Sequence, residues 1–149
     1  MTHITAVNTD ELNKKAAEEL KKQKLVQPTE WSKFVKTGQN KERLPDSQDW
    51  WYARSAAILQ TIANRGPVGT QKLRNKFGGK KRRGHKPAHF YRASGSIIRK
   101  ILQQLEKSEL VKQVEKGVHK GRVLTPKGTS FLDKLAVQIS KQEYKLSKQ

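Results

Sequence analysis

The residues best placed to do chemistry in this chain of 149 residues are its lysines and arginines, which gather in the middle of the sequence. Residues 51–100 hold thirteen Lys and Arg and no acidic residue, whereas residues 1–50 hold nine basic and eight acidic residues. A solvated basic surface usually includes acidic residues at i,i+4 spacing, which relieve the repulsion. Because no carboxylate lies between Asp49 and Glu106, we expect an external polyanion to balance this charge.

The composition excludes several other kinds of chemistry. Without cysteine the chain has no disulfide, thiolate metal site or cysteine nucleophile. The carboxylate-free middle lacks the groups that general acid–base catalysis and hard-metal binding use. No segment approaches the roughly 18 uncharged apolar residues of a membrane span. We therefore expect a soluble intracellular protein that binds nucleic acid through its net charge of +19. We expect it not to be an enzyme and to take no cofactor, metal or small-molecule substrate. We also expect it to have no membrane partner.

The densest basic run is Lys80-Lys81-Arg82-Arg83, within residues 78–93. These residues show no periodicity, which predicts a long basic loop. The run fits a nuclear-localisation signal, a solvated loop or a clamp for RNA phosphates. The absence of acidic neighbours favours the clamp, because neutralising phosphates releases their bound counterions.

Two further pairs of side chains allow alternative interpretations. His85 and His89 have the i,i+4 spacing of zinc ligands on a helix, but Pro87 and the lack of further ligands favour polar or stacking contacts to RNA. Ser94 and Ser96 fit helix caps that also meet phosphate better than nucleophiles, because no base or orienting acid accompanies them.

The positions of these residues depend on a set of predicted helices. Apolar periodicity predicts helices at residues 9–24, capped by Thr9, at 50–64 and at 96–108. A short helix capped by Thr70 follows the turn Gly66-Pro67-Val68-Gly69. That turn superficially matches the GXXG loop of KH domains but lacks their strands.

The remaining segments are predicted as connections and a hairpin. Residues 37–49 indicate a loop after a short helical turn near Trp31, and residues 111–124 predict a β-hairpin with a basic tip. Thr125-Pro126 predicts the start of the last helix, and residues 140–149 a frayed tail.

Residues 50–125 therefore follow the order of a winged helix-turn-helix, with 96–108 in the recognition position. The predicted fold is a single, mostly α domain over residues 1–149, with helices added at both ends and a small β-hairpin wing. Gln103 and Gln104 join Arg99 and Lys100 on the polar face of the recognition-position helix, which suits phosphates and base edges. The order of the predicted elements is compatible with an RNA-binding protein and with a DNA-binding transcription regulator. The missing carboxylates disfavour an RNA-processing enzyme.

The residues also carry a family resemblance, over nearly the whole chain. The sequence resembles small-subunit ribosomal protein nineteen of the archaeal/eukaryotic type, and its residues in the matching blocks are closer to those of archaeal members. The matching blocks are Glu30-Trp31, Phe34-Val35-Lys36-Thr37-Gly38, Lys41-Glu42-Arg43, Asp49-Trp50-Trp51-Tyr52 with Arg54 and Ala56, Gly66-Pro67-Val68-Gly69, Phe77-Gly78-Gly79, His89-Phe90, Ser94-Gly95-Ser96-Ile97-Ile98-Arg99-Lys100, Gln103-Gln104-Leu105-Glu106 and Pro126-Lys127-Gly128.

The resemblance implies a monomeric component of the cytoplasmic small ribosomal subunit that binds ribosomal RNA in the head, adjoins other ribosomal proteins and aids subunit assembly. By position it implies RNA contacts from Trp50, Arg54, residues 80–92, Arg99 and Lys100. For Trp50, aromatic spacing alone leaves stacking on RNA and packing against the N-terminal helix open. This chain has Gln60 at a position where members of the family commonly have a basic residue. A phosphate contact expected there is therefore weaker or is supplied by Arg65.

Together with the charge pattern, these considerations predict one set of RNA-binding residues. They are Trp50, Arg54, Arg65, Lys72, Lys76, Lys80, Lys81, Arg82, Arg83, His85, Lys86, His89, Arg92, Ser94, Ser96, Arg99, Lys100, Lys120 and Arg122.

Overall fold

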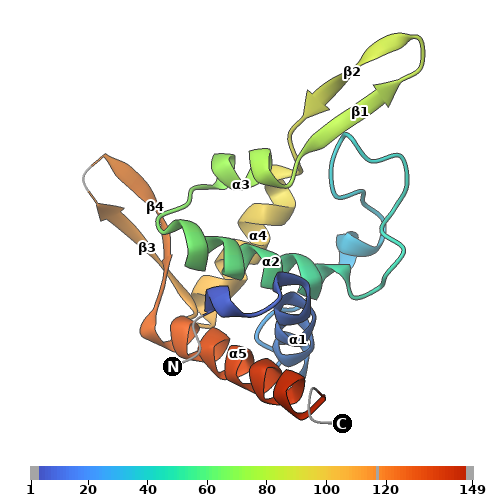
Figure 1. Cartoon of the computed structure of the whole chain (residues 1–149). Helices are drawn as coiled ribbons and strands as arrows, with labels where there is room; N and C mark the ends of the chain where they lie inside the picture. Colours follow the sequence, from blue (N-terminus) through green and yellow to red (C-terminus); the bar gives the residue numbers. More distant parts are fainter. Residues whose placement is uncertain (1–3, 117, 147–149) are drawn as a thin grey trace.

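Five α-helices and two β-hairpins form the part of the chain that the computed structural model describes, residues 4–116 and 118–146 (Figure 1). The mostly α, winged-helix-like fold predicted from the sequence is confirmed. In chain order the elements are η1 (Ile4–Ala6), α1 (Thr9–Lys22), η2 (Glu30–Lys33), α2 (Trp50–Arg65), α3 (Thr70–Lys76), β1 (Gly79–Arg83), β2 (Lys86–Tyr91), α4 (Gly95–Lys107), β3 (Val111–Lys116), β4 (His119–Leu124) and α5 (Pro126–Leu146).

Helix α2 is the centre of the fold, because its sequence is apolar around most of the circumference. Trp51, Ile58, Leu59 and Ile62 are almost fully buried where α1, α4 and β4 pack against it. A helix that is covered on several sides needs such a sequence. The remaining polar strip of α2 is therefore held in a fixed orientation by the core.

Helix α1 covers α2 through the predicted stripe of Leu12, Ala16 and Leu20, which are almost completely buried. Its cap differs from the prediction by one residue. Asn8 is the N-cap, and its side-chain oxygen accepts a hydrogen bond from the backbone N–H of Asp10 at 3.0 Å. Thr9 is instead the first helical residue, since asparagine caps helices at least as well as threonine.

Helices α3 and α4 pack against each other in the helix-turn-helix arrangement. The predicted stripe of α4 is buried, including Ile98, Ile101 and Leu105. Gly69, with extended backbone, occupies the N-cap position of α3, so the predicted cap Thr70 lies one residue inside the helix. The exposed side of α4 is thereby directed away from the core.

Strands β3 and β4 form the predicted wing, in antiparallel register from Val111 opposite Leu124 to Lys116 opposite His119. An isolated bridge fastens the wing to the turn between α2 and α3. The backbone N–H groups of Val68 and Arg122 each donate to the other residue's carbonyl at 3.1 Å. The wing is consequently joined to the helical body.

The predicted loop at residues 78–93 is wrong, because most of it is a second hairpin, β1–β2. The strands pair from Gly79 opposite Tyr91 to Arg83 opposite Lys86, and Gly84 in the turn has a φ of +69° that glycine adopts without strain. The hairpin projects away from the helices (Figure 1). Since neither face enters the core, no alternation of apolar residues marks these strands in the sequence.

Helix α5 begins as predicted, with the Thr125 hydroxyl accepting a hydrogen bond from the N–H of Gly128 at 3.1 Å. The predicted fraying of residues 140–149 is wrong up to Leu146, where the helix ends. Ile139 is buried, and Lys15 of α1 donates a hydrogen bond to the side chain of Gln142. Contacts with α1 therefore extend the helix, and residues 147–149 lie outside the described part.

Candidate nucleic-acid interface

Arg54 lies on the polar strip of α2 and is half-buried against α3. Its guanidinium carbon is 4.6 Å from the centroid of the Phe77 ring, a cation–π geometry that fixes the side chain. Burial lowers the pKa of Arg54 below its ordinary value, but an arginine stays protonated at neutral pH. Among the described residues, no carboxylate forms an ion pair with it. Arg54 is therefore a positioned cation that lacks a protein anion.

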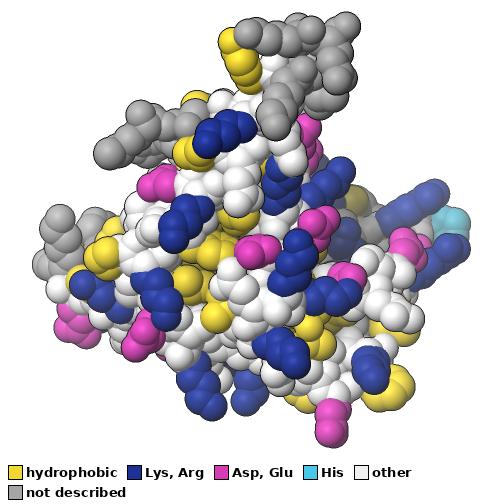
Figure 2. Space-filling view, turned by 90° about the horizontal axis from the view of Figure 1, so that it is seen from below, with side chains coloured by type: hydrophobic (Ala, Val, Ile, Leu, Met, Phe, Trp, Pro, Cys, Tyr) yellow, Lys and Arg dark blue, Asp and Glu magenta, His cyan; other side chains and the backbone are white. Residues whose placement is uncertain are grey.

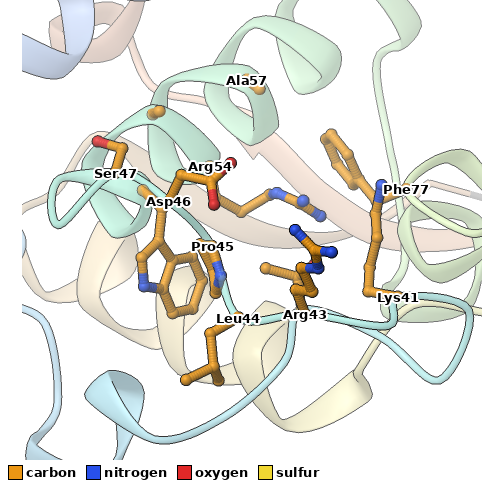
Figure 3. A pocket seen from close by; sticks show the side chains of 12 residues that line it. Lys41, Arg43, Leu44, Pro45, Asp46, Ser47, Arg54, Ala57 and Phe77 are labelled. Atoms are coloured by element: carbon orange, nitrogen blue, oxygen red, sulfur yellow. The ribbon is translucent and has the colours of Figure 1, made fainter.

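A pocket of about 680 Å³ opens beside Arg54, between α2 and the segment 37–47 (Figure 3). A bridge between Gly38 and Ala93 fastens this segment, and the Ser94 N–H donates to the Thr37 carbonyl at 3.2 Å. Lys41 and Arg43 line the pocket from the segment, facing Arg54.

The sequence reasoning did not include Lys41 or Arg43 among the site residues. Both lie in the first third of the chain, where acidic residues balance the charge, and in a loop without periodicity. The only signal was their place in the family-like block Lys41-Glu42-Arg43. Their role depends on a tertiary contact that no local pattern encodes.

A second cationic cluster lies further along α2, where Arg65 and Lys76 are close to Thr61. The ammonium group of Lys76 donates to the Thr61 hydroxyl at 2.9 Å. Burial, and then the positive charge of Arg65, lower the pKa of Lys76 below its ordinary 10.5. An anion placed here would relieve the repulsion between the two cations.

The β1–β2 hairpin carries basic and aromatic side chains on both faces. Lys81, His89 and Tyr91 share one face, where the imidazole and phenol ring centroids are 5.1 Å apart and the Lys81 ammonium is 5.8 Å from the Tyr91 centroid. Lys80 and Phe90 pair on the other face, and both are exposed. Cations alternating with aromatic rings suit phosphates and unstacked bases.

The other predicted site residues fall into two groups. Most remain exposed on the outside of α3, the hairpin and α4. These are Lys72, Arg82, Arg83, His85, Lys86, Arg92, Ser96, Arg99 and Lys100. Ser94 occupies the N-cap position of α4 but its side chain forms no capping hydrogen bond, and Arg83 donates from Nε to the Pro87 carbonyl at 2.9 Å.

In the second group, internal partners hold the basic side chains of the wing. Arg122 donates from Nε to Glu106 at 2.8 Å, and Lys120 pairs with Glu115 at 3.0 Å. These charges are partly neutralised within the protein. Among the described residues, Arg54, Arg65 and the basic residues of the β1–β2 hairpin form no such ion pairs.

Three polar or aromatic residues of the central helices have structural contacts. Gln104 accepts from the indole N–H of buried Trp51 at 3.0 Å and donates to the Gln27 carbonyl at 2.6 Å, so both ends of its amide are hydrogen-bonded within the protein. Gln60 is only 7% exposed. Trp50 is half-buried with its ring centroid 5.3 Å from that of Trp51, and it also lines the pocket beside Arg54, so packing does not remove it from the site.

The opposite side of the molecule has a different charge pattern. Seen from below, basic and acidic side chains alternate over this face (Figure 2). Helix α1 alone contributes Asp10, Glu11, Glu18 and Glu19, and α5 contributes Asp133. The acid-poor surface is thus confined to α2, α3, the β1–β2 hairpin and the start of α4.

Two absences apply to the described residues. They contain no cluster of three or more His, Cys, Asp or Glu side chains suited to a metal ion. Within the same residues, none of the helices combines the length and apolar character required to cross a membrane.

Known proteins resemble this chain over nearly its full length. The family described as ribosomal protein S19e matches residues 3–142. Small ribosomal subunit protein eS19 of Aeropyrum pernix is 42% identical over 144 residues, which cover 95% of this chain and 92% of that protein. Protein eS19G of Ascaris suum is 42% identical over 142 residues, covering 95% of each chain.

A second archaeal relative agrees with these matches. Protein eS19 of Thermoplasma acidophilum is 38% identical over 142 residues, covering 95% of this chain and 92% of that protein. The resemblance read from the sequence blocks is thereby confirmed. The chain belongs to the ribosomal protein S19e family.

Proposed function

We propose that this protein is a structural constituent of the small ribosomal subunit that binds ribosomal RNA as a monomer. The observation that carries the proposal is the acid-poor surface on α2, α3, the β1–β2 hairpin and the start of α4. Arg54 of this surface is half-buried and stacked on Phe77, and neither Arg54 nor the exposed Arg65 has an acidic partner among the described residues. Folded ribosomal RNA supplies the anions in a dense array.

Binding would proceed through many individually modest contacts. Long-range attraction brings the surface to the RNA, and neutralised phosphates release counterions to solution. Positioned groups such as the Arg54 guanidinium and the aromatic rings of the hairpin then fix the register. The α1–α5 face, with its alternating charges, is left for solvent and neighbouring ribosomal proteins.

The same contacts support a part in subunit assembly and ribosomal RNA maturation. A rigid protein surface that binds several RNA segments at once stabilises their folded arrangement by mass action. The projecting hairpin reaches RNA that the helical body does not, so it joins separate segments.

Sedimentation of a gentle cell lysate tests the proposal. Epitope-tagged protein is expected to migrate with small subunits at physiological salt and to remain with them after a moderate salt wash. Migration as a free protein, together with footprinting on a palindromic DNA duplex, would instead favour the DNA-binding regulator. When the protein is depleted, incompletely processed small-subunit RNA is expected to accumulate. Normal processing would refute the proposed role in maturation.

A further inference from the structure

The pocket between α2 and the segment 37–47 combines converging cations with apolar walls. Arg43 reaches in from the segment and Arg54 from α2, and their guanidinium groups point toward each other (Figure 3). Two such groups repel each other, and within the described residues neither forms an ion pair. An anionic group that bridges the two guanidinium groups would relieve this repulsion and accept paired hydrogen bonds from each.

The walls of the pocket offer surfaces for a planar group. Phe77 supports the Arg54 guanidinium, which presents its other face to the pocket, and Leu44, Pro45, Trp50, Ala53 and Ala57 supply apolar lining. A volume of about 680 Å³ falls within the range of small-molecule sites and exceeds what a phosphate group alone would fill.

Asp46 is the one acidic side chain that lines the pocket (Figure 3). Among the described residues Asp46 forms no ion pair with either guanidinium group. It can instead accept hydrogen bonds from an amino or hydroxyl group.

We propose that this pocket takes a single unstacked nucleotide of RNA, with its phosphate between Arg43 and Arg54 and its base against the apolar wall. The inference rests on the proposed function and specifies one contact of it. An arginine fork binds phosphate oxygens in pairs, and unpaired bases extruded from RNA stack on arginine planes and aromatic rings. Lys41 extends toward Phe77 and adds charge for a flanking phosphate (Figure 3).

Titration of the isotope-labelled free protein with small probes tests the proposal by NMR. The probes are adenosine and uridine 5′-monophosphate, ribose 5-phosphate, inorganic phosphate and tetraglutamate, with the arginine Nε–H and tryptophan indole N–H signals as readouts. The nucleotides are expected to shift the signals of Arg43, Arg54 and Trp50 and to bind about tenfold more tightly than ribose 5-phosphate, because the base stacks. Equal affinity for ribose 5-phosphate, or tighter binding of tetraglutamate, would overturn the inference.

Variants of the exposed Arg43 separate a specific contact from general charge. Arg43→Ala is expected to lower nucleotide affinity about tenfold or more, and Arg43→Lys to restore only part of it, because an ammonium group lacks the fork. Lys36→Ala removes one exposed cation from the residue that precedes the segment 37–47, outside the pocket, and is the matched control. An effect of Arg43→Ala no larger than that of Lys36→Ala would contradict the proposal.

The two proposals fail in different ways. Co-sedimentation with small subunits decides the proposed function and does not depend on Arg43 alone. If the wild-type protein migrates with small subunits while nucleotides leave the pocket signals unchanged, only the nucleotide site is refuted.

Discussion

The projecting β1–β2 hairpin allows a direct test of how the protein holds RNA. We consider a variant in which Lys80, Lys81, Arg82 and Arg83 are all replaced by alanine. Three of the four side chains are exposed and the fourth is partly so, and the strands are paired by backbone hydrogen bonds. We therefore expect the variant to fold, with a thermal unfolding midpoint within a few degrees of the wild type.

The expected loss of binding follows from counterion release. Each phosphate contact contributes about 0.7–0.9 to the slope of log K against log salt, so four contacts contribute about 3. Between 50 and 200 mM salt, a slope difference of about 3 corresponds to a factor of roughly 60 in the salt-induced change of affinity. The variant is also expected to bind more weakly at every salt concentration in this range.

Filter binding to small-subunit ribosomal RNA at several salt concentrations measures the slope. The matched control replaces four exposed lysines of α1 and α5, namely Lys14, Lys22, Lys134 and Lys141, by alanine. This control removes the same total charge from the face with alternating charges. An unchanged slope in the hairpin variant, or an equal change in the control, would refute the reasoning.

Three further predictions address the helical body. Arg54→Lys keeps the charge but loses the fork and the stack on Phe77, so its affinity for the same RNA in filter binding should fall about tenfold or more, and wild-type affinity would contradict this. Gly128→Ala places a Cβ only 2.3 Å from the backbone carbonyl oxygen of Leu110, so chemical denaturation should show a loss of about 2 kcal/mol or more, and an unchanged midpoint would refute the clash. NMR titration should place the pKa of Lys76 below 10.5 in the free protein, and bound RNA should raise it because a phosphate favours the charged amine; a pKa that RNA leaves unchanged would exclude a phosphate at this site.

Helices with one buried face could be predicted from the sequence because burial leaves a periodic record. The α4 stripe that includes Ile98, Ile101 and Leu105 is one example, and Leu12, Ala16 and Leu20 of α1 are another. The order of these helices and the wing then indicated the fold. Errors at their ends were small: the cap of α1 differed by one residue, and its C-terminal end, predicted at Lys24, lies at Lys22.

The β1–β2 hairpin could not be predicted from the sequence, because residues without a buried face leave no periodic record. Its strands have no core-facing side, so Lys80 and Phe90 are both exposed and nothing alternates. The C-terminal end of α5 was also predicted wrongly. Near this end, Gln142 is hydrogen-bonded to Lys15 of α1, which lies 127 positions away from it in the sequence. Long-range contacts leave no local signal.

The candidate site was predictable in its charge but not in its details. The acid-free interval includes Arg54. It did not reveal that Gln104 is hydrogen-bonded to the indole of Trp51. It also did not reveal that Arg43, from a region with balanced charge, lies opposite Arg54 in the pocket. Sequence patterns assign residues to faces, whereas tertiary packing decides which of their groups remain free.

The central claim is that the acid-poor surface, and not the α1–α5 face, lies against ribosomal RNA. Because the chain has no cysteine, single substitutions can carry an iron chelate that cleaves nearby RNA with hydroxyl radicals. Isolated small subunits would be probed with Arg82→Cys on the hairpin and Lys134→Cys on α5. Strong, localised cleavage of the RNA from position 82 and weak cleavage from position 134 is the predicted result, and equal or stronger cleavage from position 134 would contradict the account.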